Sequence, residues 1–206
     1  TVTINNMSLK LTSASAVVFI DGPELIINNG NVEIEASGAR YIQNGGALFT
    51  QGNFNQKSNT SVCISNALVN IGEEQSGRNF VSGASSTSAN FQNDGGYRYL
   101  DNSFINVTHD YLLNSSGSGS GTSGVDVIKS CCIEVGDSGS NNAFDSPITS
   151  ADGSDAGSWV SSNNQYIFDT KISLSNGNFQ TNNKPHLFCN VGIKINKSGN
   201  FQSNSG

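Results

Sequence analysis

Short apolar patches recur about every seven to nine residues along much of this chain, and no other feature limits its fold as strongly. Within a patch the apolar residues commonly lie two positions apart, which is the strand period, because alternate side chains of a strand share a face. Each patch is too short for a helix and is followed by Asn, Gly or Ser. The first patches are Leu9 with Leu11, Val17 with Phe19, Leu25 with Ile27, and Val32 with Ile34.

Every third patch returns to the same kind of residue about 22 positions later. Three strands and three turns in a repeat of about this length are one coil of a parallel β-helix. The sequence therefore predicts an all-β, right-handed parallel β-helix with three-strand coils, because parallel crossovers are right-handed. We expect residues 1–206 to form a single β-solenoid that is one segment of a longer array.

A phrase in which Asn precedes Phe recurs along the chain. An aromatic residue at the same point of each coil can stack on the rings of the coils above and below it. We therefore interpret these Phe residues as core. The copies are Asn53-Phe54, Asn90-Phe91, Asn178-Phe179 and Asn200-Phe201.

The composition agrees with a solenoid. Only 13% of the residues are charged, and 29 Asn and 23 Gly are present, which could also indicate disorder. Regular apolar patches and eleven Phe argue against disorder. Asn and Gly tolerate the left-handed backbone angles that many turns require, and stacked Asn side chains can hydrogen-bond from coil to coil.

The repeat is interrupted near residues 72–89, 115–125 and 136–163. Insertions in solenoids lie at the turns, where they leave the stack without breaking it. Such loops can carry function or can simply be tolerated, and the sequence leaves both readings open. The third interruption holds closely spaced Asp and Gly at 145–155, but the order of residues favours an ordinary turn over a calcium loop.

The net charge of −6 and the ten scattered Lys and Arg residues argue against nucleic acid or a polyanionic polysaccharide as a partner. A neutral glycan or a protein surface remains compatible with this charge. No apolar run has the length of a membrane span. We expect no metal ion and no cofactor.

The chain has four cysteines, and strand alternation predicts the direction of each. Cys131 and Cys189 share a face with apolar neighbours and are expected inside, whereas Cys63 and Cys132 are expected outside. Positions two coils apart lie about 10 Å apart, which is too far for a bridge. We favour small core residues, although at least one disulfide stays possible because sequence cannot fix the pairing.

Few residues suggest a catalytic function. His109 and Asp110 are adjacent, but no exposed nucleophile motif accompanies them, and outward acids usually keep strands soluble. We therefore expect no catalytic residues and no enzymatic activity. A glycan-binding or polysaccharide-cleaving cleft on the outer surface would have five candidate residues, namely Tyr97, Arg98, Tyr99, Asp101 and His109.

The chain opens with TVTINNMSLKLTSASAVVFIDGPELIINNG and contains the phrases GNFNQ, ANFQND, GNFQTN and GNFQSN. By these features, residues 1–71 and 165–206 resemble the β-helical segments of large secreted and cell-surface, adhesin-like repeat proteins of Bacteroidetes-type bacteria. Such proteins are exported by the type IX system. The resemblance implies a secreted or cell-surface location and a structural or adhesive role, and it carries over no catalytic residue.

Taken with the repeat, these features predict a structural and adhesive segment of an extracellular surface protein or filament. Its expected partners are neighbouring β-helical segments, or copies of itself, joined through open coil ends. One alternative is a polysaccharide-active enzyme or glycan-binding module on a β-helix. A second alternative is a self-assembling filament subunit that stacks end to end.

Overall fold

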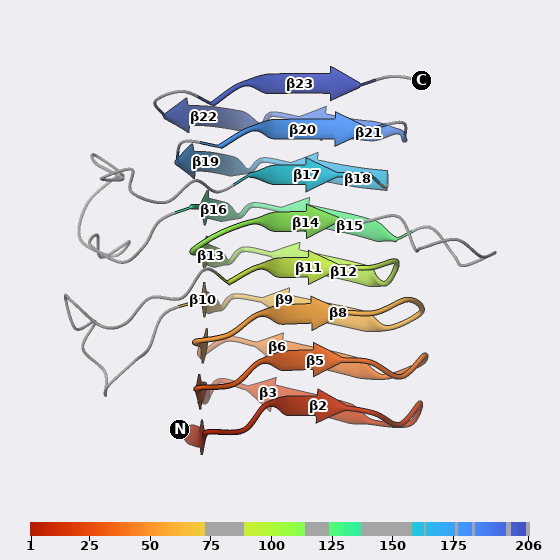
Figure 1. Ribbon diagram of the computed structural model, residues 1–206, viewed down its shortest axis with the longest axis vertical. Coiled ribbons are helices and arrows are strands. Elements are labelled where there is room, and N and C mark those ends of the chain that lie inside the picture. The colour runs from red at the N-terminus through yellow and green to blue at the C-terminus, as the bar shows by residue number, and fades with distance from the viewer. Residues whose placement is uncertain are drawn as a thin grey trace.

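The computed structural model of the protein is a stack of parallel coils (Figure 1). It describes residues 1–72, 89–113, 124–136, 158–162, 164–175, 177–182, 184–196 and 199–204. These residues form strands and turns, so none of them belongs to an apolar helix long enough to cross a membrane.

The described strands form three parallel sheets. Sheet A contains β1 (Val2–Asn5), β4 (Glu24–Asn28), β7 (Ala47–Thr50), β10 (Leu68–Ile71), β13 (Phe104–Val107), β16 (Cys132–Val135), β19 (Lys171–Ser175) and β22 (Gly192–Asn196). Sheet B contains β2 (Leu9–Leu11), β5 (Val32–Ile34), β8 (Phe54–Gln56), β11 (Phe91–Asn93), β14 (Tyr111–Leu113), β17 (Trp159–Ser161), β20 (Phe179–Asn182) and β23 (Phe201–Asn204). Sheet C contains β3 (Val17–Asp21), β6 (Arg40–Asn44), β9 (Ser61–Ser65), β12 (Tyr97–Asp101), β15 (Val125–Lys129), β18 (Asn164–Phe168) and β21 (His186–Cys189).

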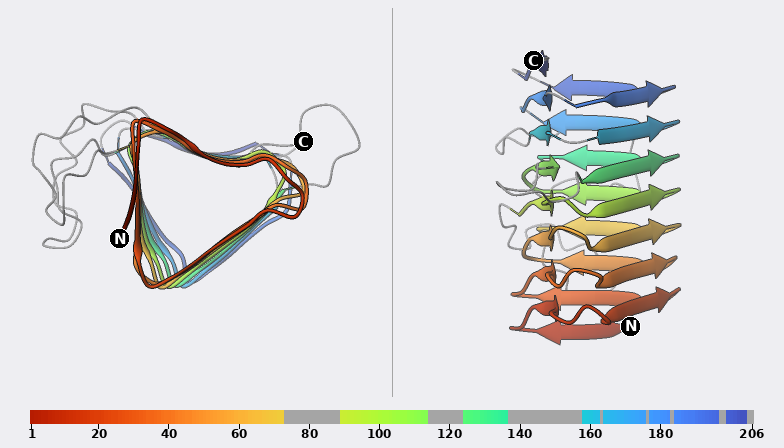
Figure 2. Two further views of the ribbon diagram at one scale, coloured as in Figure 1. Left: turned by 90° about the horizontal axis from the view of Figure 1, so that it is seen from below. Right: turned by 90° about the vertical axis from the view of Figure 1, so that its right-hand side faces the viewer.

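Each coil passes from sheet A to sheet B to sheet C and encloses a triangular cross-section (Figure 2). Seen from the N-terminal end, the chain runs clockwise as it recedes, so the solenoid is right-handed. Val2 pairs with Leu25, 23 residues further on, and Phe179 pairs with Phe201 after 22 residues. The predicted right-handed parallel β-helix with coils of about 22 residues is confirmed.

The stack continues across the interruptions that the sequence indicated. In sheet A, β10 pairs directly with β13, and β16 pairs directly with β19, without a missing strand. Residues 73–88, 114–123 and 137–157 lie outside the described residues, and they make up most of the expected insertions. The 145–155 segment considered for calcium also lies outside them.

A column of aromatic rings occupies the first inward position of sheet B. Neighbouring ring centroids lie between 3.8 Å and 5.5 Å apart, in edge-on and stacked arrangements. Phe54, Phe91 and Phe179 have no exposed surface, so they are core residues as predicted. Phe201 on β23, which has one neighbouring strand, remains 57% exposed. The members of this aromatic column are Phe54, Phe91, Tyr111, Trp159, Phe179 and Phe201.

The turn from sheet C to sheet A has two residues in every described coil, and the first of them adopts a positive φ. Glycine has no Cβ, and Asn and Asp tolerate this left-handed region better than other residues do. This requirement accounts for part of the Asn and Gly content of the chain. The residues at this position are Gly22, Gly45, Asn66, Asn102, Ser130, Asp169 and Asn190.

At the turn from sheet A to sheet B, a set of side chains joins successive coils. The residue before each sheet B strand accepts, through its side-chain oxygen, the backbone N–H of the same position in the next coil. The donor–acceptor distances run from 2.7 Å to 3.3 Å. This corner ladder consists of Ser8, Asn31, Asn53, Asn90, Asp110, Ser158, Asn178 and Asn200.

The corner ladder explains why Asn precedes Phe in the repeated phrase. The phenylalanine fills the core, and the asparagine one position earlier connects its coil to the next. At this corner a side-chain oxygen accepts the backbone N–H and so replaces the carbonyl acceptor that a neighbouring strand would have supplied.

The ladder predicts that Asn53→Ala destabilises the chain, because the N–H of Asn90 loses its acceptor. This hydrogen bond is partly buried, so its loss should cost about 1 kcal/mol in the free energy of unfolding. Urea unfolding followed by circular dichroism measures this loss. Asn53→Asp keeps an acceptor oxygen and should recover most of the stability, and Asn55→Ala, on the outer face of β8, is the control. Equal stability of Asn53→Ala and Asn55→Ala would contradict the ladder's contribution.

Candidate functional site

The five residues proposed for an outward cleft do not lie on one surface. Four of them belong to β12, where alternation separates them. Tyr97 is 44% exposed, and Tyr99 and Asp101 are partly exposed beside it on the outer face of sheet C. The hydroxyl of Tyr99 donates to Asp101 Oδ2 at 3.3 Å. Arg98 points the other way and has no exposed surface.

The prediction that Arg98 lines an outward cleft was therefore wrong. Arg98 is directly aligned with Asp126 on β15, and its Nε and Nη2 atoms donate to the two carboxylate oxygens at 3.1 Å and 2.6 Å. The guanidinium also lies 4.2 Å from the ring centroid of Phe91 and 4.4 Å from that of Tyr111. Pairing and stacking partly compensate for burying this charge, whereas the Nη1 atom has no hydrogen-bond partner.

Two further side chains complete the buried network around Asp126. Tyr111 donates its hydroxyl to Asp126 Oδ2 at 2.8 Å, and Asn93 Nδ2 donates to Asp126 Oδ1 at 3.0 Å. Burial raises the pKa of Tyr111 well above its ordinary value, so the phenol remains a donor. Because all these side chains are buried, the network belongs to the interior and cannot meet a large substrate.

His109 lies at a different corner, between sheets A and B. Its Nδ1 lies 2.9 Å from Asn90 Oδ1 and 3.1 Å from Asp110 Oδ2. Asn90 and Asp110 belong to the corner ladder, so His109 supports the coil contacts there. It is not brought together with Tyr97 or Asp101 on sheet C.

The outer face of sheet C carries an unbroken row of apolar side chains. Every member pairs in register with the next, so the row runs through all seven strands of the sheet. Phe19 is 64% exposed and Leu187 is 49% exposed, and the five residues between them are partly exposed. We name this row the sheet C stripe, and it consists of Phe19, Ile42, Cys63, Tyr99, Val127, Tyr166 and Leu187.

Two mixed rows border the stripe. The first edge row contains Val17, Arg40, Ser61, Tyr97, Val125 and Asn164. The second edge row contains Asp21, Asn44, Ser65, Asp101, Lys129, Phe168 and Cys189. Partial burial on this face raises the pKa of Tyr97, Tyr99 and Cys63.

The outer faces of the other two sheets differ from sheet C. On sheet B the outward residues of the first four coils are polar or charged, namely Lys10, Glu33, Asn55 and Gln92. On sheet A the outward residues Ile26, Phe49 and Asn70 retain at most 6% exposure. Sheet C is therefore the outer face that presents a long apolar surface to solvent, and we regard it as the candidate site.

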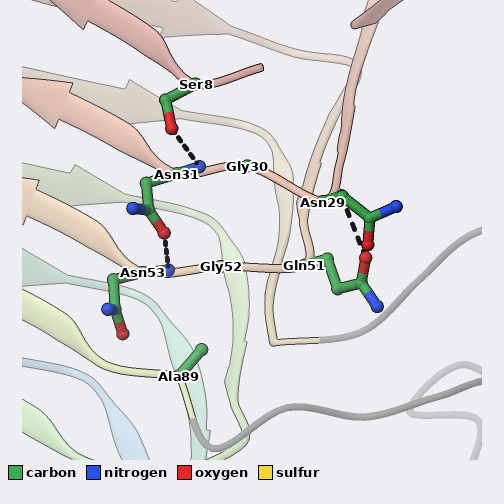
Figure 3. A pocket seen from close by; sticks show the side chains of 8 residues that line it. All are labelled: Ser8, Asn29, Gly30, Asn31, Gln51, Gly52, Asn53 and Ala89. Atoms are coloured by element: carbon green, nitrogen blue, oxygen red, sulfur yellow. Dashed lines mark hydrogen bonds between the residues drawn. The ribbon is translucent and has the colours of Figure 1, made fainter. Parts of the chain in front are cut away.

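A recess of about 380 Å³ lies at the corner between sheets A and B (Figure 3). Its lining contains Ser8, Asn29, Gly30, Asn31, Gln51, Gly52, Asn53 and Ala89. Ser8 and Asn31 accept ladder hydrogen bonds there, and Gln51 accepts the backbone N–H of Asn29 at 2.9 Å. The lining contains no charged side chain, and its polar groups are engaged in joining coils, so the recess is a weaker candidate than sheet C.

The four cysteines are free thiols in the structure. Cys131 is buried and Cys63 and Cys132 are partly exposed, as alternation predicted. The prediction that Cys189 points inward was wrong, because β21 pairs with β18 so that Phe188 turns inward instead of Leu187. Burial raises the pKa of the Cys131 thiol to about 11, which leaves it protonated and unreactive near neutral pH.

Within the described residues, no three His, Cys, Asp or Glu side chains are grouped so that they could hold a metal ion. The chain matches no protein-family model, and comparisons with curated proteins and with solved structures give no significant match.

The buried network predicts an asymmetric response to substitution. Arg98→Met leaves the Asp126 carboxylate buried without its cation, and the free energy of unfolding should fall by about 3–5 kcal/mol. The triple variant Arg98→Met/Asp126→Leu/Tyr111→Phe removes both charges and the hydroxyl that would lose its acceptor, so it should recover at least half of that loss. Urea unfolding of the wild type and both variants checks this. A triple variant less stable than Arg98→Met would contradict the account.

Proposed function

We propose that this chain is a structural and adhesive β-solenoid segment of an extracellular surface protein or filament. The observation that supports the structural role best is the corner ladder, which joins every described coil to the next beside three parallel sheets. Each coil is thus held to its neighbour on all three sides and at the corners, which favours a stiff, elongated body.

The interior supports the same role. The aromatic column, the aliphatic residues of sheet A and the buried network around Asp126 are directed toward one another within the coils. Side chains that fill a core contribute stability to the rod. The alternative of a polysaccharide-active enzyme has less support, because Arg98 faces inward and His109 lies at another corner.

The adhesive role is supported by the sheet C stripe. A long, solvent-exposed apolar row is the kind of surface that marks an interaction site. The rod would hold this surface at a fixed orientation, so that many weak contacts act together.

Stretching single molecules between tethers at the two ends tests the structural role. Because each coil contacts only its neighbours, we expect resistance in successive steps, each releasing about one coil of 22 residues. The Asn53→Ala variant should lower the force of the step that separates the coil of β8 from the coil of β11. Extension at low force without steps would contradict the proposed load-bearing role.

Retention of coated beads under flow tests the adhesive role. Beads carrying the full chain should remain on surfaces coated with the same chain or with a neutral polysaccharide. Tyr166→Lys places a charge on the stripe and should reduce retention severalfold, because an unpaired ammonium resists desolvation. Val160→Lys, on the outer face of sheet B, is the matched control. Equal retention of the two variants would contradict a role for sheet C in adhesion.

A further inference from the structure

The sheet C stripe is the longest continuous apolar row on the outer surface of the described coils. Its seven members share one register position, so they form a straight line along the stack. Neighbouring strands lie about 4.8 Å apart, which makes the row about 29 Å long. A row of this length favours an extended partner over a small ligand.

We propose that the sheet C stripe is the contact face for a second copy of this chain, packed sheet to sheet. This inference rests on the adhesive part of the proposed function and names the partner of that surface. Two β-sheets can pack face to face about 10 Å apart when their facing side chains are apolar, as in β-sandwiches.

The repeat distance supports a second copy over an unrelated globular partner. The stripe offers one side chain per coil, at a spacing fixed by backbone hydrogen bonding. Only a surface with the same spacing can place a side chain against each coil without drifting out of register. The sheet C face of another copy has this spacing along its whole length.

The charges on this face also suit self-association. The chain carries a net charge of −6, yet the two edge rows hold two cations, Arg40 and Lys129, and two anions, Asp21 and Asp101. The charges on this face therefore sum to zero, although the whole chain is acidic. Two such faces can approach each other without the repulsion that the net charge would otherwise imply.

The edge rows further select one orientation. A two-fold axis parallel to the stack would place the first edge row of one copy against the second edge row of the other, coil by coil. Tyr97 then faces Asp101 of the other copy, and Arg40 faces Asn44, one coil from Asp21. No two like charges oppose each other in this arrangement.

The opposite orientation is disfavoured by one residue. A two-fold axis perpendicular to the stack would reverse the order of the coils and would place β12, the central strand of sheet C, against itself. Asp101 would then face Asp101 of the other copy, and like charges in apposition are unfavourable. We therefore assign the parallel arrangement, in which Cys63 faces Cys63.

The area of the contact face limits the affinity that we expect between the two copies. A face of five residues by seven strands measures about 16 Å by 29 Å, a footprint of about 460 Å² on each copy. Stable interfaces bury about 1,200–2,000 Å² in total, so this contact lies below that range. We therefore expect a reversible dimer with a dissociation constant in the micromolar range.

Sedimentation equilibrium of the full chain from about 1 to about 200 µM tests the proposal. The wild type should shift from monomer to dimer with increasing concentration. Val127→Lys, at the centre of the stripe, should raise the dissociation constant at least tenfold. Leu112→Lys, on the outer face of β14 in sheet B, is the matched control and should leave dimerisation unchanged. Thermal melts establish that both variants fold.

A wild-type chain that remains monomeric throughout would overturn the proposal, and so would equal weakening by both lysine variants. Bead retention on the neutral polysaccharide would still stand in the first case, so failure of this inference can be told from failure of the adhesive role.

Cross-linking of the native Cys63 tests the orientation without disturbing the stripe. A short bis-maleimide applied to a Cys132→Ser/Cys189→Ser variant, whose Cys131 is buried, should join Cys63 to Cys63 at dimer-forming concentrations. Linkage that appears only between Cys63 and an introduced Val127→Cys would overturn the parallel arrangement.

Discussion

Hydrogen bonding between successive coils is the interaction on which the rest of this structure depends. Strands of three to five residues are too short to be stable alone, and each is held by parallel partners on one or both sides. Where the backbone turns from sheet A to sheet B and the ladder of strands stops, side chains such as Asn53 and Asn90 continue the pairing. The stack is therefore connected at a corner as well as within the sheets.

Because the coils stack in strict register, the residues at one position of successive coils form a row along the stack. The same pairing that stacks Phe54 on Phe91 in the core aligns Cys63 with Tyr99 on the outer face. A polar residue in the interior then needs a partner in a neighbouring coil, which Arg98 finds in Asp126. The core, the buried network around Asp126 and the sheet C stripe all result from this register between coils.

The fold could be predicted from the sequence to a large extent, and the candidate site only in part. Phe91 is predicted as core because it belongs to the repeated phrase in which Asn precedes Phe. The candidates for an outward cleft included Arg98, although alternation within β12 directs it to the face opposite that of Tyr97. Cys189 was misplaced because Leu187 and Phe188 are both apolar, and alternation alone cannot tell which of two such neighbours turns inward.

The sequence by itself determined the coil, since strand alternation, turn residues and the return of Phe after about 22 residues are local properties. Only the tertiary structure decided which residues become neighbours between coils. Cys63 pairs with Tyr99 after 36 residues, Tyr99 with Val127 after 28, and Val127 with Tyr166 after 39. Such unequal spacings conceal the sheet C stripe in the linear chain, because inserted segments change the residue count without changing the place of a strand in its sheet.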